Sequence, residues 1–202
     1  MKPMTPSFKE MTDGQIDKAV SVYRDMLRKH RSELDSDAVQ DVLGQPDYVA
    51  EQATILRRRT EEISDIMLRI VSVNRARTPQ ETLKATRRVQ SINDKVVSTM
   101  PHGEGNTVKV FFFKPHRSVN EEELEREYKL RGLKPADPYS LAAVNEADEF
   151  FAGEHPNGTH WKDSDGRWCF ASFDRCEHIN RLEVDYCDNG WIDWWWLAGI
   201  PK

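Results

Sequence analysis

The residues best suited to chemistry are histidines and cysteines clustered between residues 155 and 187 of this 202-residue chain. They are His155, His160, Cys169, Cys176, His178 and Cys187. Zinc sites use such ligands in pairs at short fixed spacings, and the sequence has no Cys-x-x-Cys pair. Cys169 also falls within a strand-like run, where a small buried thiol is ordinary. The spacing therefore predicts no metal site, and nothing in it indicates a cofactor.

A cysteine nucleophile with a histidine base is a second chemistry that these residues allow. The partners of such a pair need only meet in space, so Cys176 with His178, or any other pair, stays open. We keep an enzyme with a Cys/His site in the C-terminal half as an alternative function.

The run from Asp163 to Gly166 resembles the opening of a calcium loop. A calcium loop needs further oxygen ligands, and Trp168 and Phe170 follow instead. The run therefore predicts a turn.

Aromatic residues indicate binding more strongly than catalysis. "WIDWWWLAGIPK" places four tryptophans within residues 191–196, and "HPNGTHW" (155–161) surrounds Asn157 with histidines and a tryptophan. Aromatic and polar groups together are typical of recognition sites. We predict a contact surface made of Trp191, Asp193, Trp195, Asn157, His160 and Trp161.

Strands must position most of these residues. "TVKVFFF", "RWCFASF" and "RLEVDYC" have strand composition, and Asn189-Gly190 favours a hairpin that makes the last two strands antiparallel partners. In the last strand, we assign Ile192, Trp194 and Trp196 to the core. Trp191 and Trp195 then cover the outer face.

The first half predicts helices. Capping patterns begin at Thr12 and Thr78, and Pro46 can open a long helix whose apolar stripe includes Ile63 and continues through Ile70. Two more helices, one starting after Asn120 and one at Pro138, are expected in the second half.

Charge also divides the chain. Residues 1–100 hold 17 Lys and Arg against 15 Asp and Glu, whereas residues 101–202 hold 12 against 19. We predict a helical region at 1–98 and an α+β domain at 107–202, separated by a Pro- and Gly-containing segment. Two arginine clusters in the first half, Arg57 to Arg59 and Arg87 with Arg88, make a nucleic-acid-associated protein a further alternative.

Composition favours a cytoplasmic protein. No apolar run approaches the roughly 20 residues of a membrane span, and the first residues show no secretory signal. Three cysteines argue for reduced thiols. The sequence leaves the oligomeric state open.

Several long phrases resemble a family of uncharacterised proteins from uncultured, small-genome bacteria and mobile elements. They are "SDAVQDVLGQP", "RTPQETLKATRRVQ", "LRGLKPADPYSLAAVNEAD", "HPNGTHWKDSDGRWCF" and "WWWLAG". The resemblance runs along nearly the whole chain, and the segment that holds Cys176 and Cys187 departs from it most. It implies no activity, cofactor or catalytic residue.

The sequence thus predicts an α+β fold, in which a helical bundle or long helical hairpin precedes a small, mainly antiparallel sheet with two helices. The leading function is a non-enzymatic, cytoplasmic binding or adaptor protein. Its partner would be a protein or a small molecule, with nucleic acid as the weaker alternative and no membrane.

Overall fold

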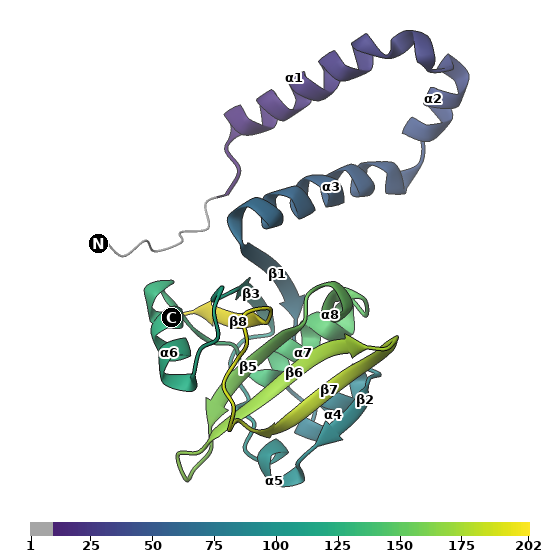
Figure 1. The fold of residues 1–202 in the computed structure, drawn as a ribbon. Helices are drawn as coiled ribbons and strands as arrows, with labels where there is room; N and C mark the ends of the chain where they lie inside the picture. Colours follow the sequence, from purple (N-terminus) through teal and green to yellow (C-terminus); the bar gives the residue numbers. More distant parts are fainter. Residues whose placement is uncertain (1–9) are drawn as a thin grey trace. The chain divides into compact units, whose positions relative to one another are not determined.

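The computed structural model describes residues 10–202 and shows two compact units, one of helices up to Ile63 and one of mixed structure from Ser64 to Lys202 (Figure 1). Residues 1–9, where the sequence predicts no secretory signal, lie outside the described residues. The predicted boundary at residues 98–107 lies inside the second unit. We call the two parts the helical unit and the sheet unit.

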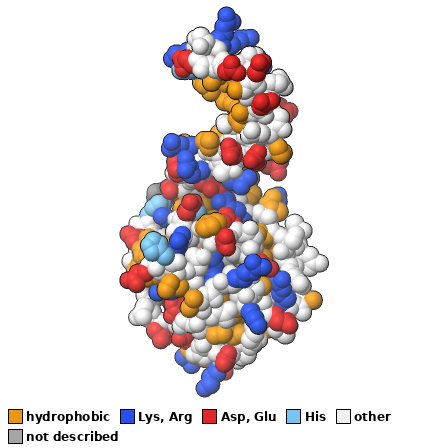
Figure 2. All heavy atoms as spheres, turned by 90° about the vertical axis from the view of Figure 1, so that its right-hand side faces the viewer, with side chains coloured by type: hydrophobic (Ala, Val, Ile, Leu, Met, Phe, Trp, Pro, Cys, Tyr) orange, Lys and Arg blue, Asp and Glu red, His pale blue; other side chains and the backbone are white. Residues whose placement is uncertain are grey.

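The helical unit contains α1 (Asp13–Lys29), a 3-10 turn at Arg31–Glu33, α2 (Ser36–Leu43) and α3 (Pro46–Ser64). The predicted cap at Thr12 forms. The Thr12 side chain accepts a hydrogen bond from the backbone N–H of Gln15, and the Gln15 side chain accepts one from the backbone N–H of Thr12. No residue of these three helices is buried. Figure 2 shows hydrophobic side chains open to view on these helices.

The sheet unit is built on eight strands in a mixed sheet. The order is β1-β3-β8-β5-β6-β7-β2, with β4 paired to β8. The strands are β1 (Ile66–Ser72), β2 (Val89–Ile92), β3 (Thr107–Phe113), β4 (Leu133–Pro135), β5 (Asn157–Lys162), β6 (Trp168–Cys176), β7 (Ile179–Tyr186) and β8 (Trp196–Pro201). The helices are α4 (Pro79–Ala85), α5 (Asp94–Val97), α6 (Glu121–Leu130), α7 (Pro138–Ala147) and α8 (Phe151–Glu154). The α+β class is therefore correct.

The sheet has eight strands, so it is not the small one that the sequence predicts. It is mixed: five of its seven strand pairings are antiparallel, as expected, and two are parallel. β2 pairs with β7, and β5 with β8, in parallel. The expected hairpin at Gly190 is also wrong, because β7 pairs with β6 and β2 while β8 pairs with β3, β4 and β5. The chain only bends at Asp188 and Asn189, Gly190 has a φ of 65°, and the next residue, Trp191, bridges to Val119.

The expected long helix through Ile70 is wrong as well. α3 ends at Ser64, Asp65 has a positive φ of 51°, and β1 begins at Ile66. Met67 and Val71 are buried in β1 while Ile70 is exposed. Apolar residues spaced by three and four fit a helix, but this run is also rich in β-branched residues and has a strand partner in β3.

Both faces of the central strands are buried. Along β3, Val110 and Phe112 enter the larger core and Phe113 enters a second core, which also holds Leu124 and Tyr128 of α6. The same alternation divides β8, whose Ala198 faces the first core and whose Leu197 faces the second. This explains the apolar sequence of the last strand, since each of its faces meets a core.

Candidate functional site

The residues predicted to form one contact surface fall into separate places. His160 and Trp161 line one cavity, which we call the His160 cavity, and Trp191 and Trp195 line another, the Trp195 cavity. Asn157 lies in the core, where its side chain is hydrogen-bonded to Asn145 over 2.9 Å. Asp193 is exposed and lines neither cavity.

The predicted faces of the last tryptophans are wrong in part. Trp194 and Ile192, assigned to the core, are 42% and 46% exposed, whereas Trp191 is only 3% exposed. Residues 191–195 are not part of β8: Trp191 makes an isolated bridge to Val119, and the chain turns before Trp196. The strand alternation on which the prediction relied therefore does not extend to these residues.

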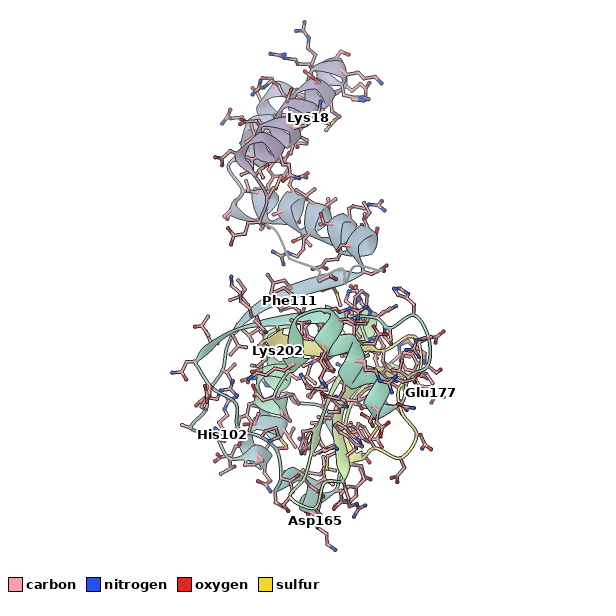
Figure 3. The ribbon with its side chains drawn as sticks, turned by 90° about the vertical axis from the view of Figure 1, so that its left-hand side faces the viewer. Lys18, His102, Phe111, Asp165, Glu177 and Lys202 are labelled. Atoms are coloured by element: carbon pink, nitrogen blue, oxygen red, sulfur yellow. The ribbon has the colours of Figure 1, made fainter. Side chains whose placement is uncertain are left out.

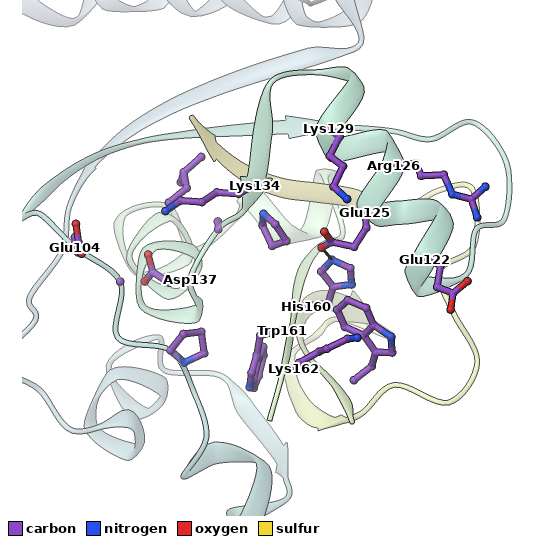
Figure 4. Close-up of a pocket in the computed structure, with 16 residues that line it drawn as sticks. Glu104, Glu122, Glu125, Arg126, Lys129, Lys134, Asp137, His160, Trp161 and Lys162 are labelled. Atoms are coloured by element: carbon purple, nitrogen blue, oxygen red, sulfur yellow. Dashed lines mark hydrogen bonds and ion pairs between the residues drawn. The ribbon is translucent and has the colours of Figure 1, made fainter. Parts of the chain in front are cut away.

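His160 lies at the centre of a buried charge cluster. It points from β5 toward α6, where Glu121 and Glu125 are four residues apart and so share one helix face. Asn120 caps α6 and fixes its first turn, because Asn120 and Glu123 form a capping box. Nδ1 of His160 contacts Glu121. Nε2 lies 3.1 Å from Oε1 of Glu125, and Figure 4 shows this second pair.

The hydrogen bonds indicate a charged imidazolium. Each ring nitrogen of His160 faces a carboxylate oxygen, and only a ring protonated on both nitrogens can donate to both. Burial alone lowers the pKa of His160, but the hydrogen bonds and charges of Glu121 and Glu125 outweigh it and leave the pKa above its ordinary value. The hydrogen bond from His160 lowers the pKa of Glu125 in turn.

Cys187 extends this cluster toward the second cavity. Its thiol donates to Oε1 of Glu121 over 2.6 Å, so the chain Cys187–Glu121–His160–Glu125 joins a residue lining the Trp195 cavity to residues lining the His160 cavity. Burial, followed by the hydrogen bond to Glu121, raises the pKa of Cys187. The thiol therefore acts here as a hydrogen-bond donor.

The His160 cavity has a volume of about 920 Å³ and lies among α6, β4, β5 and the segment before β3. Its apolar wall includes Trp161, Pro135 and Ile200. The indole of Trp161 donates to Oγ1 of Thr99 over 3.1 Å, which fixes its orientation. The ring of Trp168 stacks on His160, with centroids 4.7 Å apart.

Some of the charged side chains around the His160 cavity have ion-pair partners, and others have none among the described residues. Of the four acids that line the cavity, Glu125 binds His160 and Asp137 binds Arg75, whereas Glu104 and Glu122 form no ion pair among the described residues. Lys129, Lys134 and Lys162 also line the cavity and are exposed, and within residues 10–202 none of the three forms an ion pair. Lys162 lies over the ring of Trp168, at 4.5 Å. Figure 4 shows Lys129 on the same side of α6 as Glu125.

The Trp195 cavity is smaller, with a volume of about 410 Å³. It lies between the β6–β7 pair and the segment that precedes β8. Three carboxylates and four aromatic rings line it: Glu183, Asp185, Asp188, Phe170, Tyr186, Trp191 and Trp195.

Neither Cys176 nor Cys169 has surroundings that support the alternative cysteine–histidine chemistry. Cys176 and His178 lie at the β6–β7 turn, whose exposed tip Glu177 is labelled in Figure 3. Cys169 is buried in β6, and burial raises its pKa. Among the described residues, His, Cys, Asp and Glu side chains form no group of three or more that could hold a metal ion.

The turn predicted at Asp163 is confirmed. Its Oδ1 accepts from the backbone of Asp165 at 3.0 Å and of Arg167 at 2.8 Å, and Gly166 has a φ of 79°. The carboxylate is therefore used within the turn, near Asp165 in Figure 3.

The two arginine clusters differ in exposure. Arg58 and Arg59 are exposed on α3 and both pair with Glu62, at 3.9 and 3.1 Å. Arg88 is buried, donates to the carbonyl of Glu149 and lies over Phe173. Arg87 and Arg88 therefore do not form one surface cluster, which is a correction to the nucleic-acid alternative. No helix in residues 10–202 is long and apolar enough to span a bilayer.

Sequence reasoning missed the two glutamates and the three lysines. Glu121 and Glu125 were visible only as part of an acidic helix. Their spacing of four residues could have indicated a shared face, but nothing in the sequence told which histidine that face meets.

Comparisons with known proteins identify no relative: no family model, no curated protein and no solved structure matches the chain, so its resemblance to a family from small-genome bacteria stays a prediction.

Proposed function

We propose that this chain is a binding protein whose His160 cavity holds a small organic anion. The observation that carries the proposal is the group of three lysines, Lys129, Lys134 and Lys162, which have no ion-pair partner among the described residues and surround a cavity with a fixed aromatic wall. A carboxylate, sulfonate or phosphate would pair with the lysines. The apolar body of the ligand would lie against Trp161 and its neighbours.

The size of the cavity supports a ligand of this kind. Small-molecule sites typically have volumes of about 300–1,000 Å³ and combine apolar walls with a few placed polar groups. The His160 cavity, at about 920 Å³, falls within that range. Its lysine side chains are exposed, so the ligand anion would meet them without first breaking an ion pair.

Binding is favoured over catalysis by the state of His160. Both of its ring nitrogens are engaged by glutamates, so neither is free to accept a proton from a substrate. Its charge is balanced by Glu121 and Glu125, and its role in the proposal is to hold α6 against the sheet. The cytoplasmic location and the adaptor role with a protein partner stay predictions.

The test uses a matched pair of probes and the indole N–H signals of the six tryptophans in a ¹H–¹⁵N spectrum. 1-Anilinonaphthalene-8-sulfonate carries the aromatic body and the anion, whereas N-phenyl-1-naphthylamine lacks only the sulfonate. We expect the sulfonate to shift the Trp161 and Trp168 signals saturably. The neutral probe should bind about ten-fold or more weakly, since a charged hydrogen bond contributes roughly 1.5–3 kcal/mol.

A double variant, Lys129→Gln with Lys134→Gln, should abolish that preference for the anion. Lys84→Gln is the control, because Lys84 is exposed on α4 and does not line the cavity. If the two probes bind alike, or if the double variant binds the sulfonate as the wild type does, the proposal is wrong.

A further inference from the structure

Whereas both lysines and carboxylates line the His160 cavity, the charged residues that line the Trp195 cavity are all acidic. Glu183, Asp185 and Asp188 line it, and no lysine or arginine is among its lining residues. Asp185 accepts from the side chain of Asn93 at 2.9 Å, which orients it without neutralising it. Within the described part of the chain, Glu183 and Asp188 form no ion pair. The carboxylates thus give this concave site a negative field, which the guanidinium of Arg167 on the Tyr186 ring offsets only in part.

The aromatic rings of this cavity stand at right angles to one another. Trp191 and Trp195 have centroids 5.6 Å apart and an interplanar angle of 86°, and Phe170 meets Trp191 at 85°. Trp194 stacks on one face of Trp195, with centroids 4.7 Å apart, so a cation could meet only the other face of that ring. The faces of tryptophan rings attract cations, especially where water is partly excluded.

Two further contacts bear on the kind of ligand. The guanidinium of Arg167 lies 3.4 Å from the centroid of Tyr186, so one ring of this wall already holds a cation. Trp191 is 3% exposed, and within residues 10–202 its Nε1 has no hydrogen-bond acceptor. A buried donor without an acceptor is costly, and this atom is closed to solvent, so the cavity does not open onto it.

We propose that the Trp195 cavity binds an organic cation, an ammonium or guanidinium group, between the Trp195 ring and the carboxylates of Glu183 and Asp188. The cation would be carried by a free small molecule or by a side chain of a peptide. This site shares no lining residue with the anion site, although the chain from Cys187 to Glu125 connects the two.

The test again follows the tryptophan indole signals of the full chain. Tetramethylammonium and methylguanidinium chloride are the probes. tert-Butanol has nearly the shape of tetramethylammonium without its charge, and sodium chloride matches the ionic strength. We expect at least one of the two cations to shift the Trp191 and Trp195 signals saturably, and neither tert-butanol nor sodium chloride to do so. The Trp161 and Trp168 signals should stay unchanged, which separates this result from the anion test.

Variants decide whether the charge and the ring are responsible. Glu183→Gln with Asp188→Asn should weaken cation binding about ten-fold or more, because two charged partners are lost. Trp195→Leu should weaken it by several-fold. Glu177→Gln, an exposed glutamate at the β6–β7 turn outside the cavity, should have no effect.

The outcomes are distinct. If tert-butanol shifts the same signals as well as the cations do, or if neither cation shifts them, the proposal is overturned. A response that survives loss of both carboxylates also overturns it. Comparison of N-acetyl-lysine methylamide with a lysine-containing heptapeptide identifies the source: much tighter peptide binding supports a side chain, and equal binding supports a free cation.

Discussion

The helical unit and the sheet unit use the same local signals but differ in burial. Capping boxes begin α1 in the first and α4 and α6 in the second. In the sheet unit, strand residues reach cores on both faces of the sheet. In the helical unit, no residue of α1, α2 or α3 is buried, and Ile63 is 85% exposed.

This difference teaches that local sequence can specify an element without telling what stabilises it. Most helix stability in proteins comes from packing of an apolar face, and these three helices bury none of their residues. We therefore expect the sheet unit to carry the free energy of unfolding. The helical unit should open at a much smaller cost.

Core truncation should give the largest contrast between the units. Phe112→Ala removes a fully buried ring and should lower the free energy of unfolding by about 3–5 kcal/mol. Leu56→Ala, on the exposed α3, should change it by no more than about 0.5 kcal/mol. Urea denaturation followed by tryptophan fluorescence measures both, since all six tryptophans lie in the sheet unit. Equal losses of unfolding free energy in the two variants would contradict the expected difference between the two units.

Removal of one charge partner should give the next largest contrast. Glu121→Ala takes a hydrogen-bond partner from both His160 and Cys187, and loss of one partner of a buried ion pair typically costs about 3–5 kcal/mol. We expect the lower end, about 3 kcal/mol, because Glu125 still binds His160. Glu62→Ala, which removes exposed pairs on α3, should cost less than about 1 kcal/mol.

Calorimetric unfolding of the two glutamate variants beside the wild type tests this. A loss at Glu121 as small as the loss at Glu62 would mean that the buried cluster does not hold α6 to the sheet.

The pH dependence of the unfolding free energy should be the smallest of these effects, and it should arise in the sheet unit. The pKa of His160 is raised in the folded state, so its contribution to stability is fully present below about pH 6.5, the unfolded value, and is lost as pH rises through the folded pKa. The size of the effect follows from the difference between the folded and unfolded pKa values, because a ten-fold change in proton affinity is worth about 1.4 kcal/mol.

Unfolding free energies measured between pH 5 and 9 should fall over this range in the wild type and less so in His160→Phe. Glu125 acts in the opposite direction, because its lowered pKa gives stability that is lost as pH falls through the folded value. Identical pH profiles for wild type and variant would contradict the assignment of a charged His160.

The sequence predicted elements better than it predicted their partners. The caps at Thr12, Thr78 and Asn120 located helix starts, because capping depends on residues three apart. β1 was missed because its apolar spacing also fits a helix. The partners of β8 were missed because an Asn-Gly pair indicates only the local backbone conformation. The pairing of β8 with β3 joins residues more than 80 positions apart.

The candidate sites show the same limit. His160 and Trp161 were chosen for their residue types, and the structure places both beside a cavity. The glutamates that fix His160 come from α6, more than 30 residues earlier, and their contact depends on how α6 packs against the sheet. Trp191 and Trp195 line a cavity together although they were expected on a regular strand face.

The position of β8 in the sheet order affects how the protein is made. The ribosome synthesises residues 196–201 after all the other strands, yet β8 lies between β3 and β5. Without β8, the strand order leaves β1 with β3 on one side and β5, β6, β7 and β2 on the other, each with an unpaired edge. Unpaired strand edges are templates for aggregation. We therefore expect the growing chain to need chaperones that shield these edges until the last strand joins the two halves.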